Sequence, residues 1–91
     1  MVKTSKVVRL LLEKHNKPKF NIAKCCEELN EASTVLLQRL NKGAGVPDEK
    51  IIEELAHARI RLDYMIDVFG KKKVQKEINK KEQHLIKKYS K

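Results

Sequence analysis

The sequence has little of what a deep globular core is built from. Among 91 residues there is no Trp, and there are only two Phe and two Tyr. A chain of this length makes one domain, and its core is too small to give a wide stability margin alone. Apolar residues make up 41% and charged residues 36%. This balance favours long exposed helices with narrow apolar stripes.

Other features are missing as well, and each absence excludes a class of protein. No apolar run approaches the roughly 20 residues of a membrane span. The N-terminus has no apolar segment followed by a signal-peptide cleavage site. Cys25 and Cys26 are adjacent, which is neither a disulfide framework nor a zinc framework. We therefore predict a cytoplasmic protein in a reducing compartment, with no membrane partner.

The net charge of +9 is unevenly distributed along the chain. Residues 1–24 carry seven Lys or Arg and one Glu, and residues 71–91 carry nine Lys and two Glu. Residues 25–70 carry five basic and nine acidic side chains. The acidic central residues thus lie between two basic terminal segments, whose positive charge attracts phosphates. The alternative interpretation is that the Lys-rich end is simply a solvated helix face.

Periodicity and turn residues predict an all-α single domain over residues 1–91. We expect helices over 21–41, 48–69 and 71–89, preceded by an N-terminal segment, 1–20. Residues 4–15 are predicted as a helix, although the run VVRLLL also fits a short strand.

Local residues are expected to set the ends of these helices. Asn21 is predicted to cap the first long helix. Asp48 and Glu49 place negative charge in the first turn of the second, and Gly70 ends it.

Each long helix carries an apolar stripe that we expect to face the core. In the first helix the stripe is Ile22, Cys25, Cys26, Leu29, Ala32, Ser33, Leu36 and Leu40. In the second it is Ile51, Leu55, Ala58, Leu62, Met65, Ile66 and Phe69.

Acidic side chains lie on one flank of each stripe. At about 100° per residue, Glu28 and Glu31 lie on the same flank of the first helix, one turn apart. Glu54 and His57 have the same spacing on the matching flank of the second. A short Gly- and Pro-containing connection favours antiparallel helices, whose matching flanks then lie on one side of the pair. With the turn centred near Gly45, Glu31 comes level with His57, and the four side chains converge.

These residues carry a resemblance to a known family. Glu27-Glu28-Leu29-Asn30-Glu31 resembles the EExxE motif of MazG-like nucleotide pyrophosphohydrolases, and Glu53-Glu54-Leu55-Ala56-His57 stands where that family has EExxD. The similarity extends from about Asn21 through the Lys-rich end and is strongest to the short, phage-type, single-domain members.

The resemblance implies an antiparallel helical bundle of the MazG-like type, completed by oligomerisation to a homodimer or a tetramer. It implies a hydrolase that cleaves a nucleoside or deoxynucleoside triphosphate to the monophosphate and pyrophosphate. Carried over by position, Glu28, Glu31, Glu54 and His57 are the catalytic residues and the ligands of Mg²⁺ (or Mn²⁺). Mg²⁺ prefers a few oxygen ligands together with water and phosphate oxygens.

His57 is where the sequence departs from the family motif. Imidazole suits Mn, Fe, Ni or Zn better than Mg²⁺. Asp63 and Asp67 project from the opposite flank and do not compensate. Three interpretations remain: an enzyme that uses His57 for another metal or for a proton, a weak enzyme, or a degenerate protein kept for binding. Arg61 and Tyr64 lie on the same flank as the acidic residues, where they could contact phosphate or base. The alternative is that Arg61 forms an ion pair with a carboxylate and Tyr64 is a packing residue.

A different class of function is a non-enzymatic helical module that binds nucleic acid or a partner protein through its basic ends. It accounts for the net charge, but it leaves the two matched carboxylate pairs unexplained, since they repel phosphate in the absence of a metal. Assembly is expected from the residues as well as from the resemblance. Four apolar side chains lie off the main stripes and leave apolar surface uncovered on one subunit: Val35, Leu37, Ile60 and Val68.

Overall fold

The computed structural model describes residues 5–90, apart from the side chain of residue 44, and this part of the chain contains helices and short connections but no strand. The elements are α1 (Lys6–His15), α2 (Pro18–Lys42), the 3₁₀ turn η1 (Gly43–Gly45), α3 (Asp48–Phe69) and α4 (Lys71–Tyr89). The alternative of a strand in the VVRLLL run is wrong, because these residues belong to α1. Position 4 of the predicted 4–15 helix lies outside the described residues.

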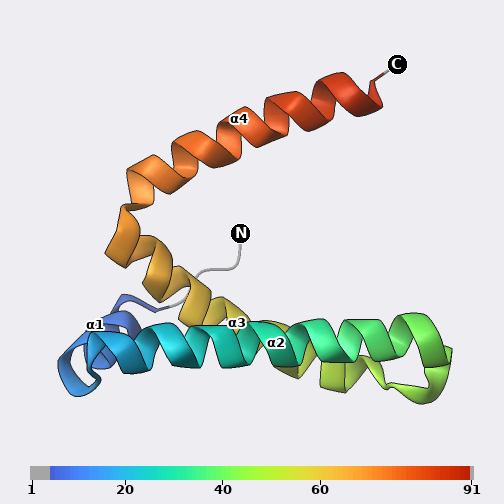
Figure 1. The fold of residues 1–91 in the computed structure, drawn as a ribbon, viewed down its shortest axis with the longest axis horizontal. Helices are drawn as coiled ribbons and strands as arrows, with labels where there is room; N and C mark the ends of the chain where they lie inside the picture. The colour runs from blue at the N-terminus through green and yellow to red at the C-terminus, as the bar shows by residue number, and fades with distance from the viewer. Residues whose placement is uncertain (1–4, 91) are drawn as a thin grey trace.

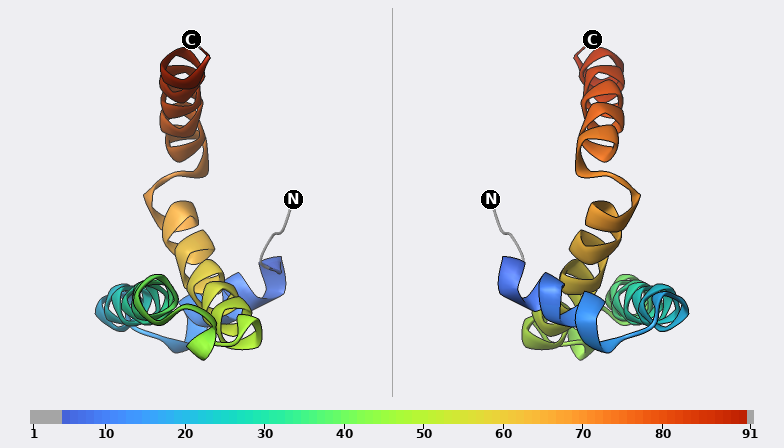
Figure 2. Two further views of the ribbon diagram at one scale, coloured as in Figure 1. Left: turned by 90° about the vertical axis from the view of Figure 1, so that its right-hand side faces the viewer. Right: turned by 90° about the vertical axis from the view of Figure 1, so that its left-hand side faces the viewer.

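Two long antiparallel helices form the body of the molecule. α2 and α3 lie side by side, and the chain reverses between them at η1 (Figure 1). α1 packs on α3 from the side opposite to α2 (Figure 2). α4 leaves the end of α3 and projects away from the body. The all-α prediction is confirmed for residues 5–90, where no helix is long and apolar enough to cross a bilayer.

The ends of α3 are where the sequence predicts them. Asp48 and Glu49 occupy its first turn. Gly70 ends it with φ at 116°, a region that side chains other than hydrogen avoid, and its N–H donates to the carbonyl of Ile66 at 2.9 Å. α4 then starts at the next residue in a new direction.

The role predicted for Asn21 is wrong. α2 begins three residues earlier, because Pro18 occupies its first turn, where a missing N–H costs nothing. Asn21 is instead 1% exposed. Its amide nitrogen donates to the carbonyl of Leu12 at 3.2 Å, and its amide oxygen accepts from Nη1 of Arg61 at 3.3 Å. This one side chain therefore connects α1, α2 and α3.

The apolar stripes are, for the most part, not the faces that the two long helices bury against each other. α2 buries Asn21, Cys25, Ala32 and Val35, and α3 buries Glu54, Ala58, Asp63 and Tyr64. Small residues such as Ala32 and Ala58 allow two helices to approach closely. Val35, predicted to lie off the core, is in it.

Most of the large stripe residues face outward. The side chains that were predicted to be buried and are exposed are Ile22, Cys26, Leu29, Ser33, Leu36, Leu40, Leu55, Leu62 and Phe69. Leu37, Ile60 and Val68 are exposed as predicted.

The isolated chain is not compact for its size. Its radius of gyration is 15.7 Å, whereas about 12 Å is typical of a compact domain of this length. Its accessible surface is 7561 Å², and a compact protein of its mass exposes about 5,500 Å². Much of the difference comes from the projecting α4 and the uncovered apolar side chains of α2 and α3.

Candidate metal centre

The turn between α2 and α3 sets which of their residues lie level. Nε and Nη2 of Arg39 donate to the carbonyl of Val46 at 3.2 and 2.7 Å, and Nη2 also pairs with Asp48. The buried Val46 therefore already lies beside the last turn of α2 before α3 begins. As a result, the pairing of residues between α2 and α3 is shifted by about one helical turn from the pairing that a symmetrical reversal at Gly45 would give.

Because of this register, Glu31 is not paired with His57 as expected, and three of the four predicted side chains, Glu28, Glu54 and His57, form one group. Glu31 pairs with Glu54, and His57 lies opposite Glu28. The Nδ1 atom of His57 lies 3.8 Å from Oε2 of Glu28 and 4.0 Å from Oε1 of Glu54. Glu28, Glu54 and His57 each offer one ligand atom, and these atoms lie within 4.8 Å of one another.

Two of the carboxylates are buried and incompletely paired. The side chain of Glu54 is 5% exposed and that of Glu28 is 14% exposed. Oε2 of each is inaccessible and has no hydrogen-bond partner. Burying a charged oxygen without a partner is unfavourable, so native structures rarely retain such a group without a reason.

The pKa values of Glu31 and Glu54 are shifted in opposite directions. Burial by itself would raise the pKa of Glu54, but its hydrogen bonds with Glu31 and Lys50 and the charges of Lys50 and His57 hold that pKa below its usual value. The hydrogen bond to Glu54 is the main cause that raises the pKa of Glu31, followed by desolvation and the charge of Glu28.

A cavity of about 360 Å³ opens beside this pair. It is lined by Glu31, Thr34, Val35, Gln38, Lys50 and Glu54. Nζ of Lys50 lies 3.3 Å from Oε1 of Glu54, and this ion pair raises the pKa of Lys50. The sequence analysis missed Lys50, yet its i, i+4 spacing from Glu54 is a recognisable ion-pair signal. The cavity thus combines the carboxylates of Glu31 and Glu54, which attract a metal ion, with the ammonium group of Lys50, which attracts phosphate.

These side chains fit a divalent cation with a small adjustment. Opposite ligands of Mg²⁺ lie about 4.2 Å apart, since each oxygen is about 2.1 Å from the ion. The ligand atoms of Glu28, Glu54 and His57 lie within 4.8 Å of one another, so side-chain rotations are sufficient to close around an ion. The two carboxylates suit Mg²⁺ or Mn²⁺, and the imidazole favours Mn²⁺.

The other acidic residues of α3 are engaged elsewhere. Oδ1 of Asp63 lies 2.8 Å from Nε of Arg59, and Oδ2 of Asp67 lies 2.7 Å from Nε of Arg9. Neither is part of the cluster, and Asp67, expected on the flank opposite to Tyr64, lines a cavity together with Tyr64. Arg61 binds the amide of Asn21, which differs from both the phosphate contact and the carboxylate ion pair considered from the sequence.

No protein-family model, no curated protein and no solved structure matches the chain. The resemblance to the MazG-like enzymes therefore rests on the motif residues alone.

Proposed function

We propose that the protein is a divalent-metal-dependent nucleoside triphosphate pyrophosphohydrolase. The observation that carries this proposal is the pair of buried carboxylates, Glu28 and Glu54, each with one unpartnered oxygen beside His57. A cation coordinated there satisfies both oxygens at once. Electrostatic repulsion among the carboxylates, which disfavours the cluster in the free chain, then becomes an attraction for the ion.

The reaction follows from what the residues are placed to do. Water attacks the α-phosphorus, the bond from that phosphorus to the bridging oxygen breaks, and pyrophosphate leaves with the bonding electrons. A bound divalent cation would neutralise phosphate charge and lower the pKa of water. Glu28 and Glu54 would hold it, and the exposed Glu31, which faces the cavity, is placed to accept the proton of the water. Lys50 is placed to bind a phosphate oxygen.

His57 is proposed to decide which metal supports the reaction. Its ring is 46% exposed and touches the cluster only through Nδ1. An imidazole nitrogen is a better ligand for Mn²⁺ than for Mg²⁺. Mn²⁺ should therefore support turnover better than Mg²⁺, and His57→Asp should reverse that preference.

We also propose that a second copy of the chain covers the exposed apolar flank of α2 and α3. The surface in excess of a compact monomer is about 2,000 Å², and a stable interface removes about 800 Å² per partner. The excess is thus large enough for a dimer, and for a tetramer built from dimers. The flank lies on the side of the helix pair away from the acidic cluster, so assembly leaves the cluster accessible.

The decisive test is pyrophosphate release from each ribonucleoside and deoxynucleoside triphosphate, with Mg²⁺ and Mn²⁺ compared. The parent should release pyrophosphate from at least one nucleotide, and Glu28→Gln should abolish release. Glu53→Gln is the matched control, because Glu53 is exposed and lies outside the cluster. Absence of release from every nucleotide with either metal would contradict the proposal.

One feature of the fold favours a second candidate function, binding of nucleic acid. α4 projects from the body and carries eight Lys against two Glu (Figure 1). Lysines that neutralise phosphates give binding that weakens steeply with salt. Measured affinity for a duplex at two salt concentrations, in the parent and in a chain ending at Phe69, distinguishes this function. Binding that is salt-sensitive and lost with α4, combined with no pyrophosphate release, would favour it over the enzyme.

A further inference from the structure

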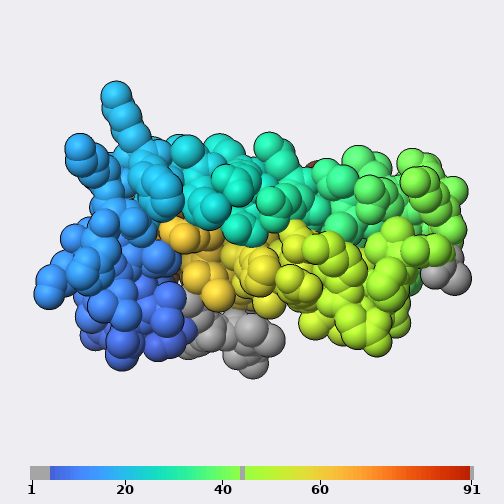
Figure 3. Space-filling view, turned by 90° about the horizontal axis from the view of Figure 1, so that it is seen from below, coloured from blue at the N-terminus to red at the C-terminus, as the bar shows by residue number. Residues whose placement is uncertain are grey.

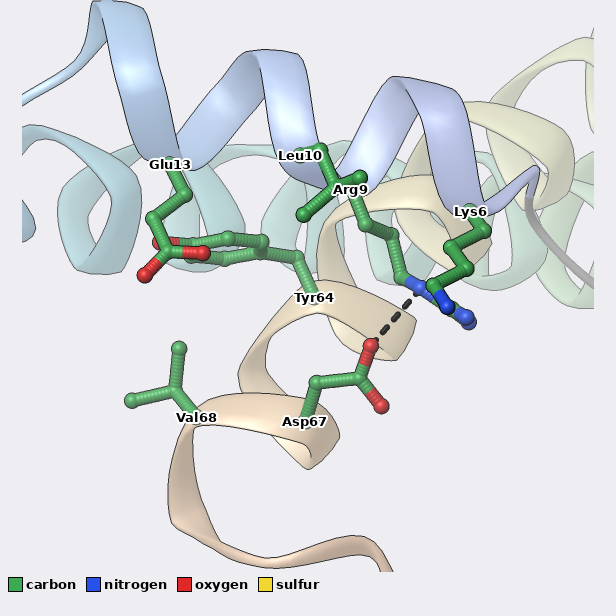
Figure 4. Close-up of a pocket in the computed structure, with 7 residues that line it drawn as sticks. All are labelled: Lys6, Arg9, Leu10, Glu13, Tyr64, Asp67 and Val68. Atoms are coloured by element: carbon green, nitrogen blue, oxygen red, sulfur yellow. Dashed lines mark ion pairs between the residues drawn. The ribbon is translucent and has the colours of Figure 1, made fainter.

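A second cavity lies along the same flank of α3 as the acidic cluster. Its volume is about 400 Å³, and its lining residues are Lys6, Arg9, Leu10, Glu13, Tyr64, Asp67 and Val68 (Figure 4). α1 supplies four of these residues and α3 supplies three. Asn21 connects the end of α1 to α2 and α3 beside this cavity.

The position of this cavity relative to the cluster follows from helix geometry. Tyr64 is seven residues beyond His57, which is two helical turns or about 10 Å along α3. Both side chains project from the same flank, at nearly the same angle around the helix. Figure 3, seen from below the view of Figure 1, shows part of α3 between α1 and α2. Arg61 lies between the two sites, held against Asn21.

The two cavities beside the cluster differ in chemistry. The one at Lys50 is lined by polar and charged side chains, with Val35 as the single apolar residue. The one at Tyr64 has a buried aromatic ring together with Leu10 and Val68, and the carboxylate of Glu13 lies at its edge (Figure 4). A ring with apolar neighbours suits a flat heterocycle, and a carboxylate accepts hydrogen bonds from amino or ring N–H groups.

The ion pair of Arg9 and Asp67 closes one wall of the cavity at Tyr64. Nε of Arg9 lies 2.7 Å from Oδ2 of Asp67, yet this N–H is buried and makes no hydrogen bond of good geometry. The contact is therefore an ion pair in which the N–H is not directed at the oxygen. It fixes α1 against α3 at the N-terminal end of α1.

We infer that a nucleoside triphosphate lies along this flank in one direction, with its nucleoside in the cavity between α1 and α3 and its pyrophosphate toward Lys50. This inference rests on the proposed function and adds the direction of the substrate and the residues that contact its base. The cation held by Glu28, Glu54 and His57 then lies beside the bond that breaks. Inorganic tripolyphosphate occupies the phosphate half of the site alone.

The test compares two ligands, tripolyphosphate and the nucleoside triphosphate that the parent binds best, each with Mn²⁺ by calorimetry on the full chain. Leu10→Trp fills the cavity from an exposed position on α1, so the fold is retained. It should weaken nucleotide binding at least tenfold and change tripolyphosphate binding less than twofold. Leu11→Trp is the matched control, because Leu11 is exposed on the same helix but does not line the cavity. It should change neither affinity.

Three other outcomes of this experiment would each contradict a specific claim. If Leu10→Trp leaves the nucleotide affinity unchanged, or weakens both ligands equally, the nucleoside does not occupy this cavity. If the parent binds tripolyphosphate as tightly as every nucleotide, the nucleoside makes no favourable contact, and the inference fails while the metal and phosphate site stands. If the parent binds neither ligand, the proposed function fails together with the inference.

Discussion

The two flanks of the α2–α3 pair differ in a way that reverses the usual pattern of burial. On one flank, Glu28 and Glu54 are largely buried, with oxygens that have no partner. On the other, Leu29, Leu36 and Leu62 are between 38% and 47% exposed. Buried carboxylates and exposed leucines are both unfavourable in an isolated chain.

We propose that each flank is completed from outside the chain, by a cation at the acidic cluster and by a second copy of the chain at the leucines. Since the flanks lie on opposite sides of the same two helices, the two requirements are separable. A substitution on one flank should remove its own partner and leave the other partner bound.

The largest expected effect is on assembly. Leu29→Glu with Leu36→Glu should convert the oligomer into a monomer, because a two-fold interface loses each leucine twice. A loss of roughly 2 kcal/mol at each of these four leucine side chains amounts to about 8 kcal/mol, which weakens a dimer about a millionfold. Sedimentation at tens of micromolar measures the change.

The control is Ala23→Glu, which adds a charge at an exposed position of α2 outside this flank. It should leave the assembly unchanged. A parent that sediments as a monomer would show that the leucines have another occupant or none.

The next effect concerns the residue that fastens the three helices. Asn21→Ala should lower the free energy of unfolding by about 1–3 kcal/mol, since it removes the hydrogen bonds of the amide with the carbonyl of Leu12 and with Nη1 of Arg61. Asn30→Ala, on the exposed side of α2, should change it little. Denaturant titration of both variants measures the difference. Equal effects would mean that α1 does not depend on Asn21.

A smaller effect is expected in the pH dependence of the metal-free protein. The pKa of Glu31 is raised in the folded state, so its contribution to stability is complete below the unfolded pKa and is lost as the pH rises through the folded one. The pKa of Glu54 is lowered, so its contribution is present above the unfolded pKa and is lost as the pH falls through the folded one.

The parent should therefore lose stability as the pH rises above the range in which Glu ordinarily titrates, and Glu31→Gln should not show this loss. Denaturant titrations from about pH 4 to pH 7, where carboxylates titrate, compare it with the parent. A parent whose stability does not fall relative to the variant as the pH rises would contradict the raised pKa.

The smallest effect distinguishes the two adjacent thiols. Cys25 is buried and Cys26 is exposed. Burial and the neighbouring Cys26 raise the pKa of Cys25, which Arg61 only partly opposes, and the thiolate is the reactive form. In the monomeric leucine variant, Cys26 should react with a thiol reagent well before Cys25. Mass spectrometry of Cys25→Ser and Cys26→Ser chains follows each thiol. Equal rates would support the face expected from the apolar stripe.

The positions of the helices and the spacing of the acidic residues could be predicted from the sequence, but the packing of one helix against another could not. Gly70 and the charges of Asp48 and Glu49 mark the ends of α3 locally, and i, i+3 spacing places Glu28 with Glu31 and Glu54 with His57. The apolar stripe indicates a buried face without telling whether the same chain or another copy buries it. The register depends on Arg39 reaching Val46, and the role of Asn21 depends on Arg61, 40 residues away.

The most direct test of the acidic flank is the melting temperature of the protein as Mn²⁺ and Mg²⁺ are added. At about a hundred times its dissociation constant, a bound ion stabilises the fold by about 2.7 kcal/mol, which is about 10–20 °C for a domain of this size. We expect this shift in the parent at lower concentrations of Mn²⁺ than of Mg²⁺. It should be lost in Glu54→Gln and retained in Glu53→Gln. A parent whose melting temperature does not respond to either ion, or a response that survives Glu54→Gln, would contradict the account.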